Sequence, residues 1–259
     1  MKRKFLPLIL ALVCVVTCTL CLAACDSDNP FSSKAWKMKS EEVTAEQWAS
    51  ALSEDGFKNV KIESTTISEG EYERKDGTKE DIKVTIKTTV IIAEDIQYVK
   101  TEATVNKGSQ EVKDTAAKLN HEGYSTKNSD GSYTVVYKDE DGNWKQDTST
   151  VGVAYTELSQ YLMYGKMYDW FKFQGEEIGY MVDFDSEKMS WDTYQAVSGN
   201  RLKFQDGKLV ALFGDHVITE TIEEEAEDGS TSSTGKDVGR IYQMVTFTYG
   251  GQKLTVPAV

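Results

Sequence analysis

Cysteine is missing from the chain after residue 25, and proline and histidine are scarce throughout. All four cysteines fall within the first 25 residues, so no disulfide can form in the rest of the chain. Three prolines argue against a proline-rich stalk. Only two histidines occur, and neither a Gly-x-Ser-x-Gly nor a His-Glu-x-x-His sequence is present. We therefore predict a protein that is not an enzyme, with no catalytic residues, no metal site and no cofactor.

The chain also has fewer basic than acidic residues. The chain has 29 Lys and Arg against 42 Asp and Glu, a formal net charge of −13 at pH 7. An acidic surface repels the phosphates of nucleic acids and of anionic lipid headgroups. We therefore expect no nucleic-acid partner and no docking to membranes through basic patches.

The first residues have the three parts of a secretory signal peptide. A basic start at Lys2–Lys4 is followed by a mostly apolar run from Phe5 to Cys21 and then by small residues. The apolar run is short for a helix that spans a bilayer. The pattern predicts that residues 1–24 are a cleaved leader and that the rest of the chain is exported.

The tetrapeptide Leu22–Cys25 resembles the bacterial lipobox, in which the cysteine is acylated and becomes the new N-terminus. That resemblance implies that Cys25 carries a lipid such as palmitate and holds the protein on the extracytoplasmic face of the cell membrane. Each buried methylene contributes about 0.8 kcal/mol, so two or three acyl chains give a firm anchor. Residues 25–42 are polar and read as a lipidated flexible tether. The alternative is an ordinary cleaved signal followed by a free cysteine.

Residues 43–259 are long enough for one domain, and we expect a single α+β domain there. Thr44 and Gln47 fit a capping box at the start of a helix that carries Trp48 and Leu52 on one side. Further helices are expected over residues 109–121 and 155–164.

Strands account for most of the remaining chain. Apolar side chains alternate with polar ones from Ile82 to Ile92, which is typical of a strand with one wet face. Asp-Gly pairs separate short strand-like runs and are hairpin turn signals; they occur at residues 76–77, 130–131, 141–142 and 206–207. We predict an antiparallel meander of nine to eleven strands, the last at residues 253–256.

Several stretches together resemble the LolA/LppX-like lipoproteins. They are the Trp-containing helix with residues 51–60 after it, the run Leu202–Val210, and the ending from Val245 through Gly251 to Pro257. The resemblance implies one strongly curved antiparallel sheet, a half-barrel, with a few helices packed on its concave face. It also implies an apolar cavity between sheet and helices, because several members of that family bind acyl chains.

The chain has the residues for such a cavity. Aromatic side chains are dense between Tyr155 and Tyr194, and ligand sites are mostly apolar. The predicted lining residues are Trp48, Leu52, Val84, Ile86, Val90, Tyr161, Leu162, Trp170, Phe171 and Phe173. We expect them to bind a lipid or another hydrophobic ligand. The alternative is a structural or interaction lipoprotein whose core is filled and whose surface meets a protein or a glycan.

Two other features are given ordinary structural roles. His216 follows Asp215, and because neighbours in a strand point to opposite faces we predict a solvent-facing turn pair. Residues 223–237 are acidic and then rich in Ser and Thr, and they are predicted to form a solvated loop between two strands.

Overall fold

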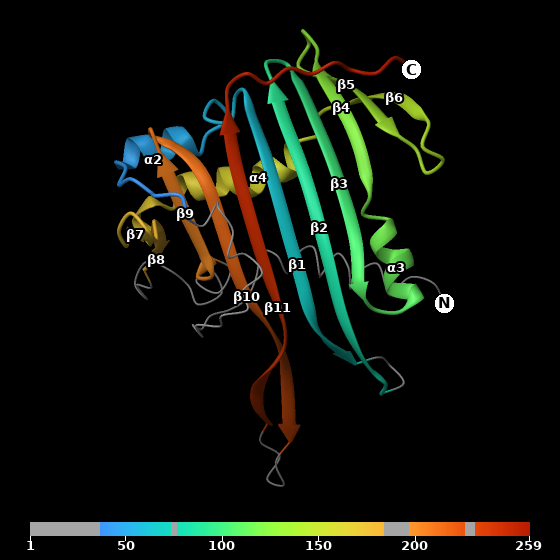
Figure 1. Cartoon of the computed structure of the whole chain (residues 1–259), viewed down its shortest axis with the longest axis vertical. Helices are drawn as coiled ribbons and strands as arrows, with labels where there is room; N and C mark the ends of the chain where they lie inside the picture. The colour runs from blue at the N-terminus through green and yellow to red at the C-terminus, as the bar shows by residue number, and fades with distance from the viewer. Residues whose placement is uncertain (1–36, 74–76, 184–196, 226–230) are drawn as a thin grey trace.

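The protein is one large antiparallel sheet with short helices (Figure 1). The computed structural model describes residues 37–73, 77–183, 197–225 and 231–259. Eleven strands form the sheet, in the order β6-β5-β4-β3-β2-β1-β11-β10-β9-β8-β7. They are β1 (Val60–Glu73), β2 (Lys79–Ala93), β3 (Ile96–Lys107), β4 (His121–Lys127), β5 (Tyr133–Lys138), β6 (Trp144–Ser149), β7 (Phe171–Phe173), β8 (Tyr180–Val182), β9 (Asn200–Gln205), β10 (Lys208–Glu225) and β11 (Thr231–Tyr249).

The strand order consists of two meanders joined through β1 and β11. Strands β1 to β6 follow one another across one half, and β7 to β11 across the other. The halves meet where β1 pairs with β11, from Val60 opposite Tyr249 to Gly70 opposite Gly239. The predicted antiparallel pairing of consecutive strands is therefore confirmed except between β6 and β7, which form the two edges of the sheet.

Local turn chemistry accounts for three of the hairpins. Gly131, Gly142 and Gly207 all have positive φ and end the Asp-Gly pairs predicted to be turns. Each pair connects two strands that are hydrogen-bonded to each other. Residues 130–131 connect β4 with β5, residues 141–142 connect β5 with β6, and residues 206–207 connect β9 with β10. At the fourth predicted turn, Asp76 lies outside the described residues.

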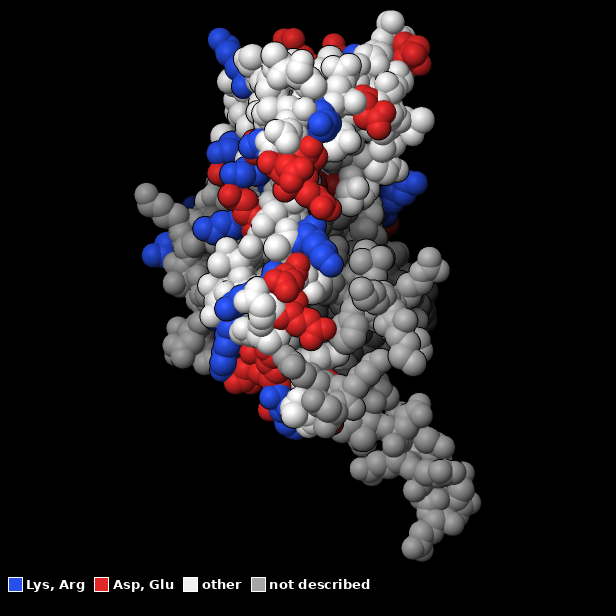
Figure 2. Space-filling model, turned by 90° about the vertical axis from the view of Figure 1, so that its right-hand side faces the viewer, with Lys and Arg blue, Asp and Glu red and all other residues white. Residues whose placement is uncertain are grey.

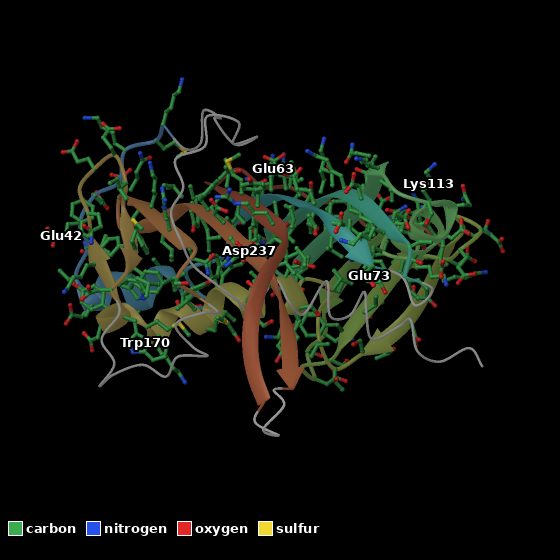
Figure 3. All side chains as sticks on the ribbon, turned by 90° about the horizontal axis from the view of Figure 1, so that it is seen from below. Glu42, Glu63, Glu73, Lys113, Trp170 and Asp237 are labelled. Atoms are coloured by element: carbon green, nitrogen blue, oxygen red, sulfur yellow. The ribbon has the colours of Figure 1, made fainter. Side chains whose placement is uncertain are left out.

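Among the described residues there are three α-helices, α2 (Ala45–Ala51), α3 (Gln110–Ala117) and α4 (Tyr155–Leu162), and two 3-10 turns, η2 (Met163–Lys166) and η3 (Tyr168–Trp170). The capping box of α2 is confirmed: Thr44 Oγ1 accepts from the Gln47 backbone N–H, and Gln47 Oε1 accepts from the Thr44 N–H at 2.8 Å. In Figures 1 and 3, α2 and α4 lie on the same side of the sheet.

Two expectations for the second half of the chain are wrong. Residues 253–256 are not a strand, since no regular structure follows Tyr249. The predicted loop 223–237 is mostly strand: β10 continues to Glu225, which pairs with Thr231 of β11. The β-branched residues Thr221 and Ile222 of β10 and Thr231 and Thr234 of β11 favour extended backbone, so the hairpin continues past the point where β1 stops pairing. Figure 1 shows this two-stranded arm projecting beyond the rest of the sheet.

The chain before α2 is hydrogen-bonded to the sheet. The Ser40 N–H donates to the Glu176 carbonyl at 2.7 Å, and the Glu41 N–H to the Phe204 carbonyl at 2.8 Å. Lys203 is 1% exposed, and its Nζ donates to the carbonyls of Met38 at 2.7 Å and of Glu177 at 2.6 Å. Residues 38–41 are therefore held against the sheet, whereas the sequence predicts a flexible tether up to residue 42.

Candidate functional site

The residues predicted to line a cavity fall into two groups. One group meets in or against the main hydrophobic core: Trp48, Leu52, Val90, Tyr161, Leu162, Trp170, Phe171 and Phe173. Val84 and Ile86 lie further along β2, on the same sheet face as Val90 because they are separated from it by even numbers of residues. The sequence pattern thus predicted that Val84, Ile86 and Val90 share one sheet face. It did not predict that only Val90 would belong to the main hydrophobic core.

Trp48 is at the centre of the first group. It is 0% exposed, and its ring centroid lies 4.9 Å from that of Phe204, 5.1 Å from that of Tyr180 and 5.4 Å from that of Phe171. Its indole N–H donates to the Tyr164 carbonyl at 2.7 Å. These contacts fix α2 against the sheet and against the η2 turn.

The sheet face that carries Val84, Ile86 and Val90 of β2 is called the inner face. Helix α4 covers only part of its length along the strands. Tyr161 packs edge-on against Phe247 with centroids 5.2 Å apart. Phe247, Ile62, Val90 and Val99 are successive partners across β11, β1, β2 and β3, so α4 lies over that row. At its other end, the Val153 and Ala154 N–H groups donate to side chains of β4 and β3.

The inner face continues well past the row that α4 covers. Val84 is six residues from Val90, and Ile241 is six from Phe247, so each lies about 20 Å further along its strand. A helix is about 10 Å wide with its side chains, so α4 does not reach them. Val84 and Ile241 are nevertheless only 4% and 1% exposed.

Two register rows define this further region, which we call the inner-face patch. Six of the eleven residues here are small or carry a hydroxyl or amide, whereas the row beneath α4 is entirely apolar. The patch consists of Thr66, Ser68, Val84, Ile86, Ala103, Val105, Asn200, Gly214, His216, Ile241 and Gln243. Six of its residues are at most 9% exposed: Ser68, Val84, Asn200, His216, Ile241 and Gln243.

One end of the patch is a buried polar corner. His216 Nε2 lies 3.1 Å from Asn200 Oδ1, and Asn200 Nδ2 donates to the Tyr164 hydroxyl at 2.7 Å. Burial lowers the pKa of His216, so the imidazole is neutral at pH 7. The bond to Asn200 Oδ1 then requires the proton on Nε2, which leaves Nδ1 as an acceptor.

Ser198 lies two residues before Asn200 in the chain. Its Oγ is the one buried side-chain N or O atom without a hydrogen-bond partner in the part of the chain that the structure describes. The next residue lies directly on the imidazole, because a Cβ added at Gly199 would be 2.8 Å from His216 Nδ1. The corner therefore has unused hydrogen-bonding capacity away from solvent.

The prediction of a solvent-facing pair at Asp215 and His216 is wrong. His216 is 5% exposed in the middle of β10. Asp215 points to the opposite face, the outer face, where Arg240 Nε and a terminal nitrogen donate to its two oxygens at 2.7 and 2.8 Å. The alternation between neighbours was correct, but the long strand places one of the two inside.

The outer face has an aromatic cluster that the sequence analysis did not identify. Tyr98 of β3, Tyr124 of β4 and Trp144 of β6 are half-buried, with centroids 4.7 and 5.7 Å apart. Lys138 Nζ lies 5.0 Å from the Trp144 ring centroid. The rings are far apart in sequence and meet only through strand register, so a sequence pattern gives no signal for them.

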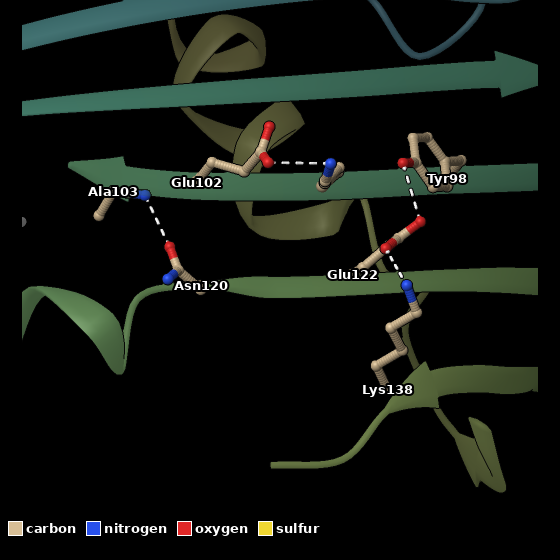
Figure 4. Close-up of polar contacts among 7 residues, drawn as sticks. Tyr98, Glu102, Ala103, Asn120, Glu122 and Lys138 are labelled. Atoms are coloured by element: carbon tan, nitrogen blue, oxygen red, sulfur yellow. Dashed lines mark hydrogen bonds and ion pairs between the residues drawn. The ribbon is translucent and has the colours of Figure 1, made fainter. Parts of the chain in front are cut away.

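Glu122 organises the polar groups around these rings (Figure 4). Its carboxylate accepts from the Tyr98 hydroxyl at 3.2 Å and from Lys138 Nζ at 2.7 Å. Partial burial opposes its ionisation, but the Lys138 and Tyr98 hydrogen bonds outweigh this and lower its pKa. Nearby, Lys100 pairs with Glu102 at 2.9 Å.

Charged side chains elsewhere on the surface are also paired or mixed. Lys83 pairs with Glu69 at 2.6 Å and Lys79 with Glu71 at 2.6 Å, all on the outer face. Figure 2, which looks at the side that carries α3 and β6, shows acidic and basic side chains interspersed. The net negative charge of the chain therefore does not gather into one patch on that side.

Cys25 lies outside the described residues. No helix in residues 37–73, 77–183, 197–225 or 231–259 is long and apolar enough to cross a membrane. No protein family model, curated protein sequence or solved structure matches the chain. The resemblance to LolA/LppX-like lipoproteins stays a prediction.

Proposed function

We propose that the protein is an exported lipoprotein, held on the extracytoplasmic face of the cell membrane by acylated Cys25, that binds a lipid or other hydrophobic ligand. The anchor is inferred from the lipobox-like Leu22–Cys25 after a basic and apolar leader. The ligand is assigned to the inner-face patch. Binding, not catalysis, is the role for which the side chains are suited.

The observation that carries the binding proposal is the length of the inner face beyond α4. The row beneath α4 is entirely apolar, and the same face continues for about 20 Å beyond it with apolar and small polar side chains. Val84, Ile86 and Ile241 supply apolar contacts in that region. Each methylene of an acyl chain buried there contributes about 0.8 kcal/mol before ordering costs.

A half-barrel with helices on its concave side is part of this proposal. It is supported by the view from below, in which the two ends of the sheet lie on the α4 side of the central strands (Figure 3). Trp170 is on that side, whereas Glu63 is on the other (Figure 3). A curved sheet encloses a ligand better than a flat one, because it surrounds more of the ligand's surface.

The test compares two matched tryptophan substitutions in β2. Ile86→Trp fills the inner-face patch, and Ile91→Trp adds the same side chain on the outer face; both positions are half-buried. Each protein is purified from the producing cell and extracted with organic solvent, and the extract is analysed by mass spectrometry. We expect Ile86→Trp to lose most of the co-purified lipid and Ile91→Trp to keep it. No stoichiometric lipid in the wild type, or equal amounts in both variants, contradicts the proposal.

The outer-face aromatic cluster favours a second function, contact with a glycan or protein partner. Tyr and Trp offer both a flat apolar surface and a polar group, and such residues dominate recognition surfaces. Trp144→Ala should weaken capture of isolated cell-wall glycans or surface proteins if the cluster binds them. Tyr155→Ala, which truncates an exposed aromatic side chain on α4, is the control, and unchanged capture by Trp144→Ala removes this candidate.

A further inference from the structure

The inner-face patch has no ionic side chain. None of its members, from Thr66 to Gln243, is Lys, Arg, Asp or Glu, and His216 is neutral because it is buried. The opposite face of the same strands is rich in ion pairs, such as Lys83 with Glu69 and Arg240 with Asp215. The ion pairs of these strands therefore lie on the opposite face, and Glu80, which shares the face of Val84 four residues away, accepts from the Ser109 N–H.

This distribution selects among hydrophobic ligands. A charged headgroup taken out of water needs an opposite charge and several hydrogen bonds, or its burial is strongly unfavourable. The strand residues of the patch provide no cation for a carboxylate or phosphate and no anion for an amine. An uncharged polar group needs only hydrogen bonds, and these the patch can give.

The polar corner has the hydrogen-bonding groups for such a headgroup. His216 Nδ1 accepts, the Tyr164 hydroxyl can donate while it accepts from Asn200, and Ser198 Oγ has no partner at all. Gly214 lets Asn200 and His216 approach the strand closely, since a Cβ there would lie 2.9 Å from Asn200 Oδ1 and 3.0 Å from His216 Nε2. Buried polar atoms that are left unsatisfied are costly, so a ligand hydroxyl here is favourable.

We propose that the ligand is an uncharged amphiphile, with its alkyl part over Val84, Ile86 and Ile241 and its hydroxyl, ester or amide group in the polar corner. This inference rests on the proposed function, because it specifies the class of ligand for the same site. Anionic fatty acids and phospholipids are excluded as preferred ligands. The membrane anchor places the protein where uncharged lipids are available.

Two photoreactive probes with the same alkyl chain test the charge preference. The full-length protein, as processed by the producing cell, is purified in a zwitterionic detergent at pH 8. It is irradiated with a diazirine monoacylglycerol, which is uncharged, or with the corresponding diazirine fatty acid, which is an anion. Labelled peptides are mapped by mass spectrometry. We expect the monoacylglycerol to label β1 and β2 about tenfold more than the fatty acid.

A matched pair of lysine substitutions makes the test specific. Thr66→Lys adds a cation to the patch, and Thr65→Lys adds one on the outer face; both threonines are half-buried. Thr66→Lys should raise fatty-acid labelling about tenfold and Thr65→Lys should not. If the fatty acid labels wild type at least as strongly as the monoacylglycerol, the inference is overturned and the proposed function stands. If neither probe labels the patch, the proposed function fails as well. Should Thr66→Lys not fold, the comparison of the two probes on the wild-type protein still tests the charge preference.

Discussion

Trp48→Ala is expected to remove a large part of the free energy of unfolding. The ring is fully buried among Phe171, Tyr180 and Phe204, and truncating a buried Trp typically costs about 3–5 kcal/mol. The Tyr164 carbonyl also loses its indole donor at 2.7 Å, and an unsatisfied buried acceptor costs about 1–3 kcal/mol. Domains of this size have about 5–15 kcal/mol in total, so the variant should be close to unfolding.

Equilibrium denaturation in urea, followed by circular dichroism, measures this loss. Trp48→Phe keeps most of the ring contacts but not the N–H, so we expect a loss of about 1–3 kcal/mol. Trp144→Ala, which truncates a half-buried Trp on the outer face, is the control and should cost less than Trp48→Ala. A midpoint for Trp48→Ala equal to that of Trp144→Ala would refute the assignment of Trp48 to the centre of the core.

Three further results are expected. Cys25→Ala should abolish incorporation of radioactive fatty acid and release the protein from the membrane fraction, and equal label in wild type and variant contradicts the anchor. Burial lowers the pKa of His216 below its unfolded value of about 6.5, so its contribution to stability is present above that pH and falls as the pH decreases. The stability advantage of wild type over His216→Leu should therefore shrink between pH 7.5 and 5, and a constant difference would show that the histidine is exposed. Lys203→Met should speed hydrogen exchange at residues 38–43, because two backbone carbonyls lose their donor, whereas unchanged exchange would mean that this segment is held by other contacts.

The sequence was enough to predict those elements that depend on residues close together in the chain. The capping box at Thr44, the hairpins at Asp-Gly pairs and the alternation along β2 each depend on residues a few positions apart. They predicted the first helix, the meander and the face that becomes the core. The pairing of β1 with β11 joins residues almost 190 positions apart and leaves no comparable local signal.

The candidate site was predicted only in part, for the same reason. Trp48 and Tyr161 belong to amphipathic helices, so their place in the core follows from helical spacing. The polar corner joins Tyr164, Asn200 and His216 from separate elements, and its burial depends on the sheet register. The outer-face rings Tyr98, Tyr124 and Trp144 likewise meet only across strands.

Site-specific photo-crosslinking in the producing cell tests most directly whether the inner face binds a hydrophobic ligand. A photoreactive amino acid is placed at position 86 on the inner face or at position 87 on the outer face of β2 in the full-length chain. After irradiation, intact-protein and peptide mass spectrometry identifies any adduct. The account predicts a lipid adduct at position 86 that is absent at position 87. No adduct at position 86, or the same adduct at both positions, would contradict it.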